Sequence, residues 1–160
     1  MNCNKSSDAT PSKVSLMTLD DLKRVSLSWL APELLEPQPK LVLLNGPMGS
    51  GKTTFVAMVA KQLGAGDAAS PSFALHSRYE GHRGTIDHFD LDRLKSLDEL
   101  ESIGFWDLID EAKSDPRRFV MIEWATRLGE FGLDVNQISG FRVWKIAFQG
   151  QPNWTIAMES

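Results

Sequence analysis

Cysteine is nearly absent from the sequence. The chain contains one, Cys3, close to its start, and a single thiol cannot form an internal disulfide framework. Chains without disulfides are typical of reducing compartments. We therefore expect a cytoplasmic protein with no disulfide partner.

Long apolar runs are absent as well. The runs 41–44 and 119–122 are strand-sized, whereas a helix that crosses a bilayer needs roughly 20 apolar residues. Residues 1–13 are polar and lack the apolar core of a secretion signal, so we expect a disordered tail. The chain has 160 residues, 42% of them hydrophobic and 24% charged, which predicts one soluble globular domain over residues 14–160 with no membrane contact.

The sequence also lacks an excess of positive charge. It has 17 lysines and arginines against 21 acidic residues, which gives a net charge of -4. A surface that neutralises many nucleic-acid phosphates needs clustered basic residues. We therefore expect any role on a nucleic acid to run through a protein partner.

Hydrophobic periodicity predicts a helix, a strand and a second helix in the first half of the chain. Apolar residues at helical spacing predict a helix over about residues 19–31, with Thr18 as its N-cap and Asp21 in its first turn. Pro32 is expected to break this pattern. The apolar run 40–45 predicts a strand buried on both faces. The next helix has five apolar residues on one face: Phe55, Val56, Val59, Ala60 and Leu63.

The second half of the chain is richer in predicted strands. Gly81 and Gly84 mark a turn, and Ser96 to Glu99 have the spacing of a capping box at the start of a helix. Strands are expected at about residues 73–79, 85–89 and 119–122, and a terminal antiparallel hairpin from residues 141–148 and 154–158.

A glycine-rich loop joins the first predicted strand to the following helix. Gly46, Gly51, Lys52 and Thr53 form the pattern Gly-x₄-Gly-Lys-Thr. The glycines let backbone N–H groups point inward, Lys52 supplies a cation to phosphates, and the Thr53 hydroxyl is placed to ligate Mg²⁺. The sequence predicts an α/β fold of the P-loop NTPase type, a three-layer sandwich with a mixed central sheet and a C-terminal antiparallel hairpin, with ATP and Mg²⁺ bound at residues 46–53.

Acidic residues at the ends of two predicted strands are candidates to complete the magnesium site. Glu123 ends the strand at 119–122, and we favour it as the metal ligand. Asp90 ends the strand at 85–89 and is then free to orient water or sense the γ-phosphate. Acids at strand ends also occur as plain turn formers. His88 is more typical of a packed or hydrogen-bonded residue than of a general base, and Trp124 either flanks the nucleotide or belongs to the core.

Several segments, taken in chain order, resemble the TsaE (YjeE) family. They are Gly49-Ser50-Gly51-Lys52-Thr53-Thr54-Phe55, Ser70-Pro71-Ser72-Phe73, His88-Phe89-Asp90-Leu91-Asp92-Arg93-Leu94 and Ile122-Glu123-Trp124. The phosphate loop alone fits many families, whereas the order and spacing of the other segments are selective. The resemblance extends from about Thr18 to the terminal hairpin.

This resemblance implies a small bacterial ATPase that acts with the TsaB and TsaD proteins in making threonylcarbamoyladenosine beside the tRNA anticodon. Such a protein supports turnover of the partner complex without carrying out the transfer, and it reaches tRNA only through that complex. The resemblance also implies roles for individual residues. Phosphates would be held by Gly49, Ser50, Gly51, Lys52, Thr53 and Thr54, Mg²⁺ by Thr53 and Glu123, and the base would lie near Thr18. Ser72 and Asp90 would belong to switch-like segments, and Lys52, Asp90 and Glu123 would carry catalysis.

The sequence departs from the family pattern at three places. Pro47-Met48 replace the usual Asp-Leu on the outer wall of the loop, Ser72 replaces a threonine but keeps its hydroxyl, and Asp92 replaces a common tyrosine.

Two other functions are compatible with a phosphate loop. A small-molecule or nucleotide kinase would also be a short P-loop chain, although such enzymes bring several arginines to the transferring phosphate, and the arginines here are dispersed. A nucleotide-gated binding module would use the bound nucleotide to control docking, with incidental hydrolysis.

Overall fold

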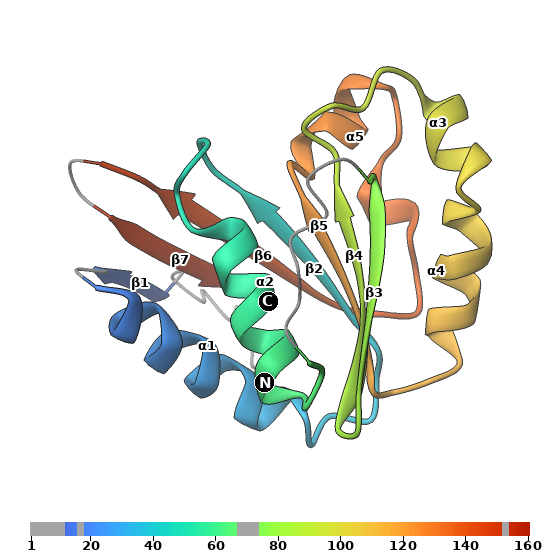
Figure 1. Cartoon of the computed structure of the whole chain (residues 1–160). Coiled ribbons are helices and arrows are strands. Elements are labelled where there is room, and N and C mark those ends of the chain that lie inside the picture. The colour runs from blue at the N-terminus through green and yellow to red at the C-terminus, as the bar shows by residue number, and fades with distance from the viewer. Residues whose placement is uncertain (1–11, 16–17, 67–73, 152–153) are drawn as a thin grey trace, which may run out of the picture.

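The computed structural model describes residues 12–15, 18–66, 74–151 and 154–160, and these contain one seven-stranded sheet (Figure 1). The strand order is β1-β7-β6-β2-β5-β4-β3. Strands β6, β2, β5 and β4 run parallel to one another, and antiparallel strands flank them on both sides. The bounds are β1 Ser12–Ser15, β2 Lys40–Asn45, β3 His76–Gly81, β4 Gly84–Asp90, β5 Arg118–Glu123, β6 Arg142–Gln149 and β7 Thr155–Glu159.

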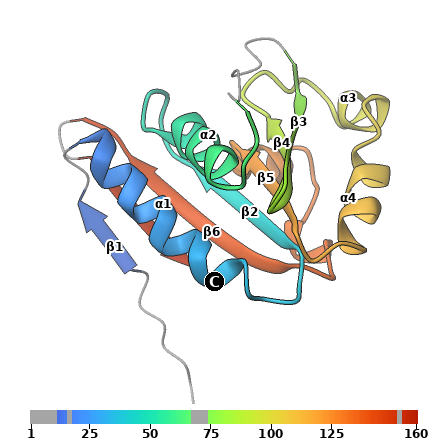
Figure 2. The same ribbon diagram turned by 60° about the horizontal axis from the view of Figure 1, so that its bottom comes forward.

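Helices cover both faces of this sheet. Helices α1 and α2 lie on one face, and α3, α4 and α5 lie on the other, which gives three layers (Figures 1 and 2). This arrangement confirms the predicted α/β sandwich with a mixed sheet and a C-terminal hairpin. The bounds are α1 Leu19–Glu33, α2 Lys52–Gln62, α3 Leu97–Ser102, α4 Phe105–Lys113 and α5 Thr126–Glu130, with a short 3₁₀ helix at Val135–Gln137.

The central strands are apolar throughout because both of their faces are covered. In β2, Val42 and Leu44 pack against α1 and α2, while Leu41 and Leu43 pack into the opposite layer. All four side chains are at most 3% exposed. Alternate residues of β5 divide in the same way between the two layers. The strands that carry the phosphate loop and Glu123 are therefore held rigidly from both sides.

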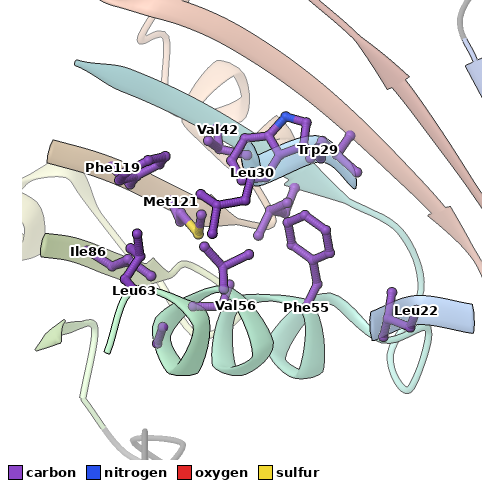
Figure 3. Packing of buried hydrophobic residues seen from close by; sticks show 14 of the residues in the cluster. Leu22, Trp29, Leu30, Val42, Phe55, Val56, Leu63, Ile86, Phe119 and Met121 are labelled. Atoms are coloured by element: carbon purple, nitrogen blue, oxygen red, sulfur yellow. The ribbon is translucent and has the colours of Figure 1, made fainter. Parts of the chain in front are cut away.

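An aromatic cluster fixes α1 and α2 to the sheet. The ring centroid of Trp29 in α1 lies 5.6 Å from that of Phe55 in α2, 6.1 Å from Phe119 in β5 and 6.0 Å from Trp144 in β6. Figure 3 shows Trp29 beside Phe55 in the packed layer. Each such pair contributes about 0.5–1.5 kcal/mol beyond its apolar burial. Helix α2, whose first turn holds Lys52 and Thr53, is thus anchored by its buried face.

Helix α1 begins as predicted but ends later. Thr18 is its N-cap and forms a capping box with Asp21. Pro32 lies inside the last turn, so the prediction that it breaks the helix was wrong. A proline removes one backbone hydrogen bond, and here the loss falls beside the exposed Ser28, where water can reach the backbone. The turn still closes because the Leu34 N–H donates to the Leu30 carbonyl at 3.0 Å.

The capping box predicted at Ser96 was also wrong. Ser96 is the N-cap of α3, but its side chain makes no capping hydrogen bond. The Glu99 carboxylate accepts instead from the Lys95 N–H at 2.8 Å, one residue before the expected donor. The helix therefore starts where the sequence pattern indicates, with a different set of end contacts.

The structure departs from the predicted elements at several places, among them β1, the start of β3 and α4. Ser12 and Lys13, at the end of the predicted tail, lie in β1 and pair with β7. The predicted strand at 73–79 begins at His76 as β3, and Phe73 lies outside the described residues. The turn at Gly81 and Gly84 is confirmed, since these residues pair across the β3–β4 hairpin. Helix α4 was not predicted, although it buries Phe105, Ile109 and Ala112.

Within the described residues, no helix has both the length and the apolar character needed to cross a membrane.

Candidate functional site

The phosphate loop connects the end of β2 to the start of α2 (Figure 1). Gly46, Gly49 and Gly51 have φ angles of 149°, 71° and 102°. These values lie in the region that side chains strongly disfavour. The glycine spacing of the motif therefore corresponds to the three bends that wrap the loop around the N-terminus of α2, where the helix dipole favours an anion.

Lys52 occupies the centre of this loop. Its side chain is 4% exposed, and its ammonium donates to the carbonyls of Gly46 at 2.7 Å and Pro47 at 2.8 Å. Burial lowers the pKa of Lys52, although the charges of Glu123, Asp90 and Asp92 oppose that shift. The ammonium is thus a buried cation whose partners are neutral carbonyls. Phosphate oxygens would provide stronger, charge-assisted hydrogen bonds at the same place.

Thr53 and Glu123 meet at the end of the central strands. The Thr53 hydroxyl donates to Oε2 of Glu123 at 3.0 Å, which joins the first turn of α2 to the last residue of β5. Hydroxyl and carboxylate oxygens are ligands that fit Mg²⁺. No group of three or more His, Cys, Asp or Glu side chains forms a metal cage in the described parts of the chain.

Asp90 lies beside Glu123 on the neighbouring strand. The two residues are register partners of the parallel strands β4 and β5. Oδ1 of Asp90 accepts from the Asp92 N–H at 3.1 Å. Burial raises the pKa of Asp90, and the charge of Glu123 raises it further. A cation bound between the loop and these strand ends would relieve this repulsion.

The chain bends sharply after Glu123. Trp124 has a φ of 57°, the one positive value at a non-glycine position among the described residues. The Thr126 N–H donates to Oδ1 of Asn45 at 3.0 Å, which fixes the bend to the end of β2. As a result the Trp124 ring centroid lies 4.3 Å from the Lys52 ammonium. Trp124 packs at the edge of the core, as one of its two interpretations expects. That it flanks a nucleotide stays a prediction. Strained backbone of this kind concentrates at functional sites.

A cavity of about 440 Å³ opens beside the loop. Its volume is in the range of small-ligand and cofactor sites. The predicted residues Thr18, Gly49, Ser50, Gly51, Lys52, Thr53 and Thr54 all line it. Leu19, Leu22 and Trp154 line it too and were missed by sequence reasoning. The two leucines could have been predicted as cavity residues from the capping position of Thr18, since they lie within the first turn of α1. Trp154 could not, because only the terminal hairpin brings it to the cavity.

Gly46, Asp90 and Glu123 were also predicted as site residues but do not line this cavity. Gly46 forms the base of the loop, and Glu123 and Asp90 lie at the adjacent strand ends. Ser72 lies outside the described residues. His88 is hydrogen-bonded to Glu123 rather than simply packed, with Nε2 lying 2.9 Å from Oε1.

The departures from the family pattern leave the loop intact. Met48 is 79% exposed on its outer wall, and Pro47 contributes only its carbonyl to Lys52. The segment around Asp92 is fixed by Arg127, which donates to the Asp92 carbonyl at 3.1 Å.

Comparisons with known proteins agree with this geometry. A sequence model of the family described as threonylcarbamoyl adenosine biosynthesis protein TsaE matches residues 22–151. A tRNA threonylcarbamoyladenosine biosynthesis protein TsaE from Rickettsia conorii is 37% identical over 101 residues, which cover 62% of this chain and 54% of the relative. The protein of that name from Aquifex aeolicus is 40% identical over 68 residues, which cover 41% of this chain and 51% of the relative. The chain thus spans about half the length of these curated relatives.

A solved structure shows the same fold. YdiB from Bacillus subtilis superposes with a TM-score of 0.60 at 19% identity, over 93% of this chain and 84% of that one. Identity at this level establishes likeness of fold alone. The family model covers most of the sequence from α1 to the terminal hairpin. The chain belongs to the TsaE family.

Proposed function

We propose that this protein binds and hydrolyses ATP as an accessory to the threonylcarbamoyladenosine modification of tRNA, acting with TsaB and TsaD. The observation that carries the proposal is the hydrogen bond of 3.0 Å between Thr53 and Glu123, next to a glycine loop that encloses Lys52. A nucleoside triphosphate and its bound cation need these groups close together in one site. The names of the relatives supply the pathway.

The side chains at the site would have different roles. Lys52 and the loop N–H groups would bind the β- and γ-phosphates, and Thr53 and Glu123 would hold Mg²⁺. The ion would neutralise charge on the phosphates. Asp90 would lie close enough to respond to the γ-phosphate, because it is paired in register with Glu123. Leu19, Leu22 and Trp154 offer an apolar wall for the base.

The arginines favour an accessory ATPase over a kinase. No arginine lines the cavity in the described part of the chain. Arg127 is engaged with backbone carbonyls of Asp92 and Leu94, and Arg142 pairs with Glu33. An enzyme that transfers phosphate to a small acceptor would need such cations at the reacting group.

The net charge of -4 supports an indirect role on tRNA. Few clustered cations are available to neutralise phosphates, so contact with tRNA would run through the TsaB–TsaD complex. A cytoplasmic location is part of this proposal, since the named relatives belong to a tRNA-modification pathway.

The test is to deplete the protein in its cell and measure tRNA nucleosides by mass spectrometry. Threonylcarbamoyladenosine is expected to fall, to return with the wild-type gene, and to stay low with Lys52→Ala. Lys61→Ala is the matched control, because Lys61 is exposed in the last turn of α2. An unchanged nucleoside level after depletion, or full rescue by Lys52→Ala, would contradict the proposal.

A further inference from the structure

A buried histidine contacts the carboxylate that completes the candidate site. His88 lies in β4 and is 2% exposed. Its Nε2 is 2.9 Å from Oε1 of Glu123. An ionised carboxylate can only accept hydrogen bonds, so Nε2 is the donor. The other ring nitrogen, Nδ1, is then free to accept from the Tyr79 hydroxyl, which lies 3.4 Å away.

The two oxygens of Glu123 are held by donors from different elements. His88 in β4 holds Oε1, and Thr53 in α2 holds Oε2. The Glu123 residue is 2% exposed, so water contributes little to its orientation. The Thr53 hydroxyl can offer a lone pair to a cation while its hydrogen still points to Oε2 of Glu123. His88 is the donor that holds the other oxygen, Oε1.

The surroundings of His88 favour a role beyond packing. The imidazole shares its sheet face with the apolar side chains of Ile86 and Met121, and Asp90 and Glu123 follow on the same face at the strand ends. A buried polar ring without partners costs free energy relative to an apolar side chain of similar size. Its position is therefore explained by its hydrogen bonds, and the shorter of these is to Glu123.

We propose that His88 is a positioning residue, which holds one oxygen of Glu123 through Nε2 so that the other oxygen stays directed at Thr53 and the metal position. The inference rests on the proposed function, because its effect is measured on nucleotide binding with Mg²⁺. Outer partners of this kind typically change metal affinity by about 10- to 100-fold when they are removed.

Two amide substitutions separate this role from a structural one. Glutamine carries its amide nitrogen as many bonds from Cα as Nε2 of histidine, and so reaches toward Glu123. Asparagine carries its amide nitrogen where Nδ1 would lie, and so reaches toward Tyr79 only. Both introduce a buried amide. A difference between His88→Gln and His88→Asn therefore reports on the contact with Glu123.

The experiment measures ATP affinity by calorimetry in EDTA and across a Mg²⁺ titration, together with the rate of hydrolysis. In EDTA, both variants are expected to bind ATP within about threefold of wild type, since neither touches the phosphate loop. His88→Gln should keep the wild-type Mg²⁺ dependence. In His88→Asn, the Mg²⁺ concentration that gives half of the affinity gain should rise about tenfold or more, with a comparable fall in hydrolysis.

A matched control comes from the neighbouring strand. His76 in β3 also contacts a carboxylate through Nε2, at 3.1 Å from Oδ1 of Asp87. His76→Gln and His76→Asn should share the wild-type Mg²⁺ dependence, because Asp87 is not part of the phosphate site. If both His76 variants needed more Mg²⁺ for the same gain in ATP affinity, any disturbance of the β3–β4 hairpin would have this effect. The proposal would then be contradicted.

The proposal is overturned if His88→Asn keeps the wild-type Mg²⁺ dependence. It is also overturned if the Mg²⁺ concentration that gives half of the affinity gain rises as much in His88→Gln as in His88→Asn. Should His88→Asn not fold, as judged by circular dichroism, His88→Gln decides: a folded protein with wild-type Mg²⁺ dependence supports the role, and one without it overturns the role. These outcomes differ from a failure of the proposed function, in which the wild-type protein itself binds no ATP in either buffer and both ideas are lost.

Discussion

Gly46 directly follows β2 and packs closely against Phe148 of β6. A Cβ atom at this position would lie 2.4 Å from the carbonyl oxygen of Phe148 and 2.8 Å from its Cβ. The carbonyl belongs to the backbone of β6 and cannot rotate away. The φ angle of 149° adds a second penalty for any side chain. Strand packing thus requires glycine at this position, whatever the loop binds.

Replacing Gly46 with alanine should therefore lower the free energy of unfolding by about 2 kcal/mol or more, because the loop must move away from β6. Urea unfolding without nucleotide measures this. Gly129→Ala is the matched control, since Gly129 lies in α5 with open space around its Cα and should change stability by less than about 1 kcal/mol. Equal stability of the two variants would show that the contact with Phe148 is not restrictive.

At the scale of elements, two helix N-caps with similar sequences differ in their contacts. The side chain of Thr18 accepts from the Asp21 N–H at 3.2 Å and Oδ2 of Asp21 accepts from the Thr18 N–H at 2.9 Å. Ser96, with Glu99 three residues later, makes no capping bond through its side chain. The sequence predicted a cap at Thr18 and a capping box at Ser96. Before α3, the Glu99 carboxylate accepts from the Lys95 N–H instead.

Thr18→Ala should accordingly cost about 1 kcal/mol of stability, while Ser96→Ala should cost less than about 0.5 kcal/mol. Thermal and urea unfolding of the nucleotide-free variants test this difference. An equal loss in both variants would mean that the cap of α3 is formed in solution, and no loss in Thr18→Ala would mean that the cap of α1 is not a source of stability.

Local features of the fold could be predicted from sequence, whereas contacts between distant segments could not. The phosphate loop and the strand ending at Glu123 each depend on residues that are contiguous in the sequence. The contact of His88 with Glu123 joins residues 35 positions apart, and it depends on β4 and β5 being neighbours in the sheet. The same holds for β1, whose four residues have a strand partner only because β7 offers a free edge.

At the scale of the whole molecule, a buried charge network ties the far side of the sheet to α4. Asp87 is fully buried in β4 and accepts from His76 and from Arg78 of β3, the latter at 2.8 Å. Arg118 of β5 lies 3.5 Å from the same carboxylate. Both arginines also pair with Glu111 of α4. The network joins three strands and one helix.

The stability that this network contributes depends on pH. Burial raises the pKa of Asp87, but the hydrogen bonds from His76 and Arg78 and the charge of Arg118 outweigh it, so the pKa lies below its ordinary value of 3.8. A lowered folded pKa means that the stabilisation is present above the unfolded pKa and is lost as pH falls through the folded value. The stabilisation by Asp87 is therefore lost only as the pH falls below about 4.

Asp87→Asn should lower the free energy of unfolding by about 2 kcal/mol at neutral pH, because Arg78 and Arg118 lose their buried carboxylate partner and keep only the exposed Glu111. The difference from wild type should shrink as pH falls below about 4. Urea titrations of both proteins across this range provide the measurement. A difference that stays constant with pH would show that the Asp87 carboxylate is not held in its charged form by the network.

We propose that ATP hydrolysis at the site of Thr53 and Glu123 sustains the TsaB–TsaD complex. The most direct measurement is the number of threonylcarbamoyladenosine residues formed on tRNA per TsaB–TsaD complex in a reconstituted reaction, with wild-type protein and with Glu123→Gln. The account predicts repeated turnover with wild type, and about one turnover or fewer with a Glu123→Gln protein that still binds ATP but hydrolyses it at least about 100-fold more slowly. Undiminished turnover with that variant would contradict the account and leave a nucleotide-gated binding module in its place.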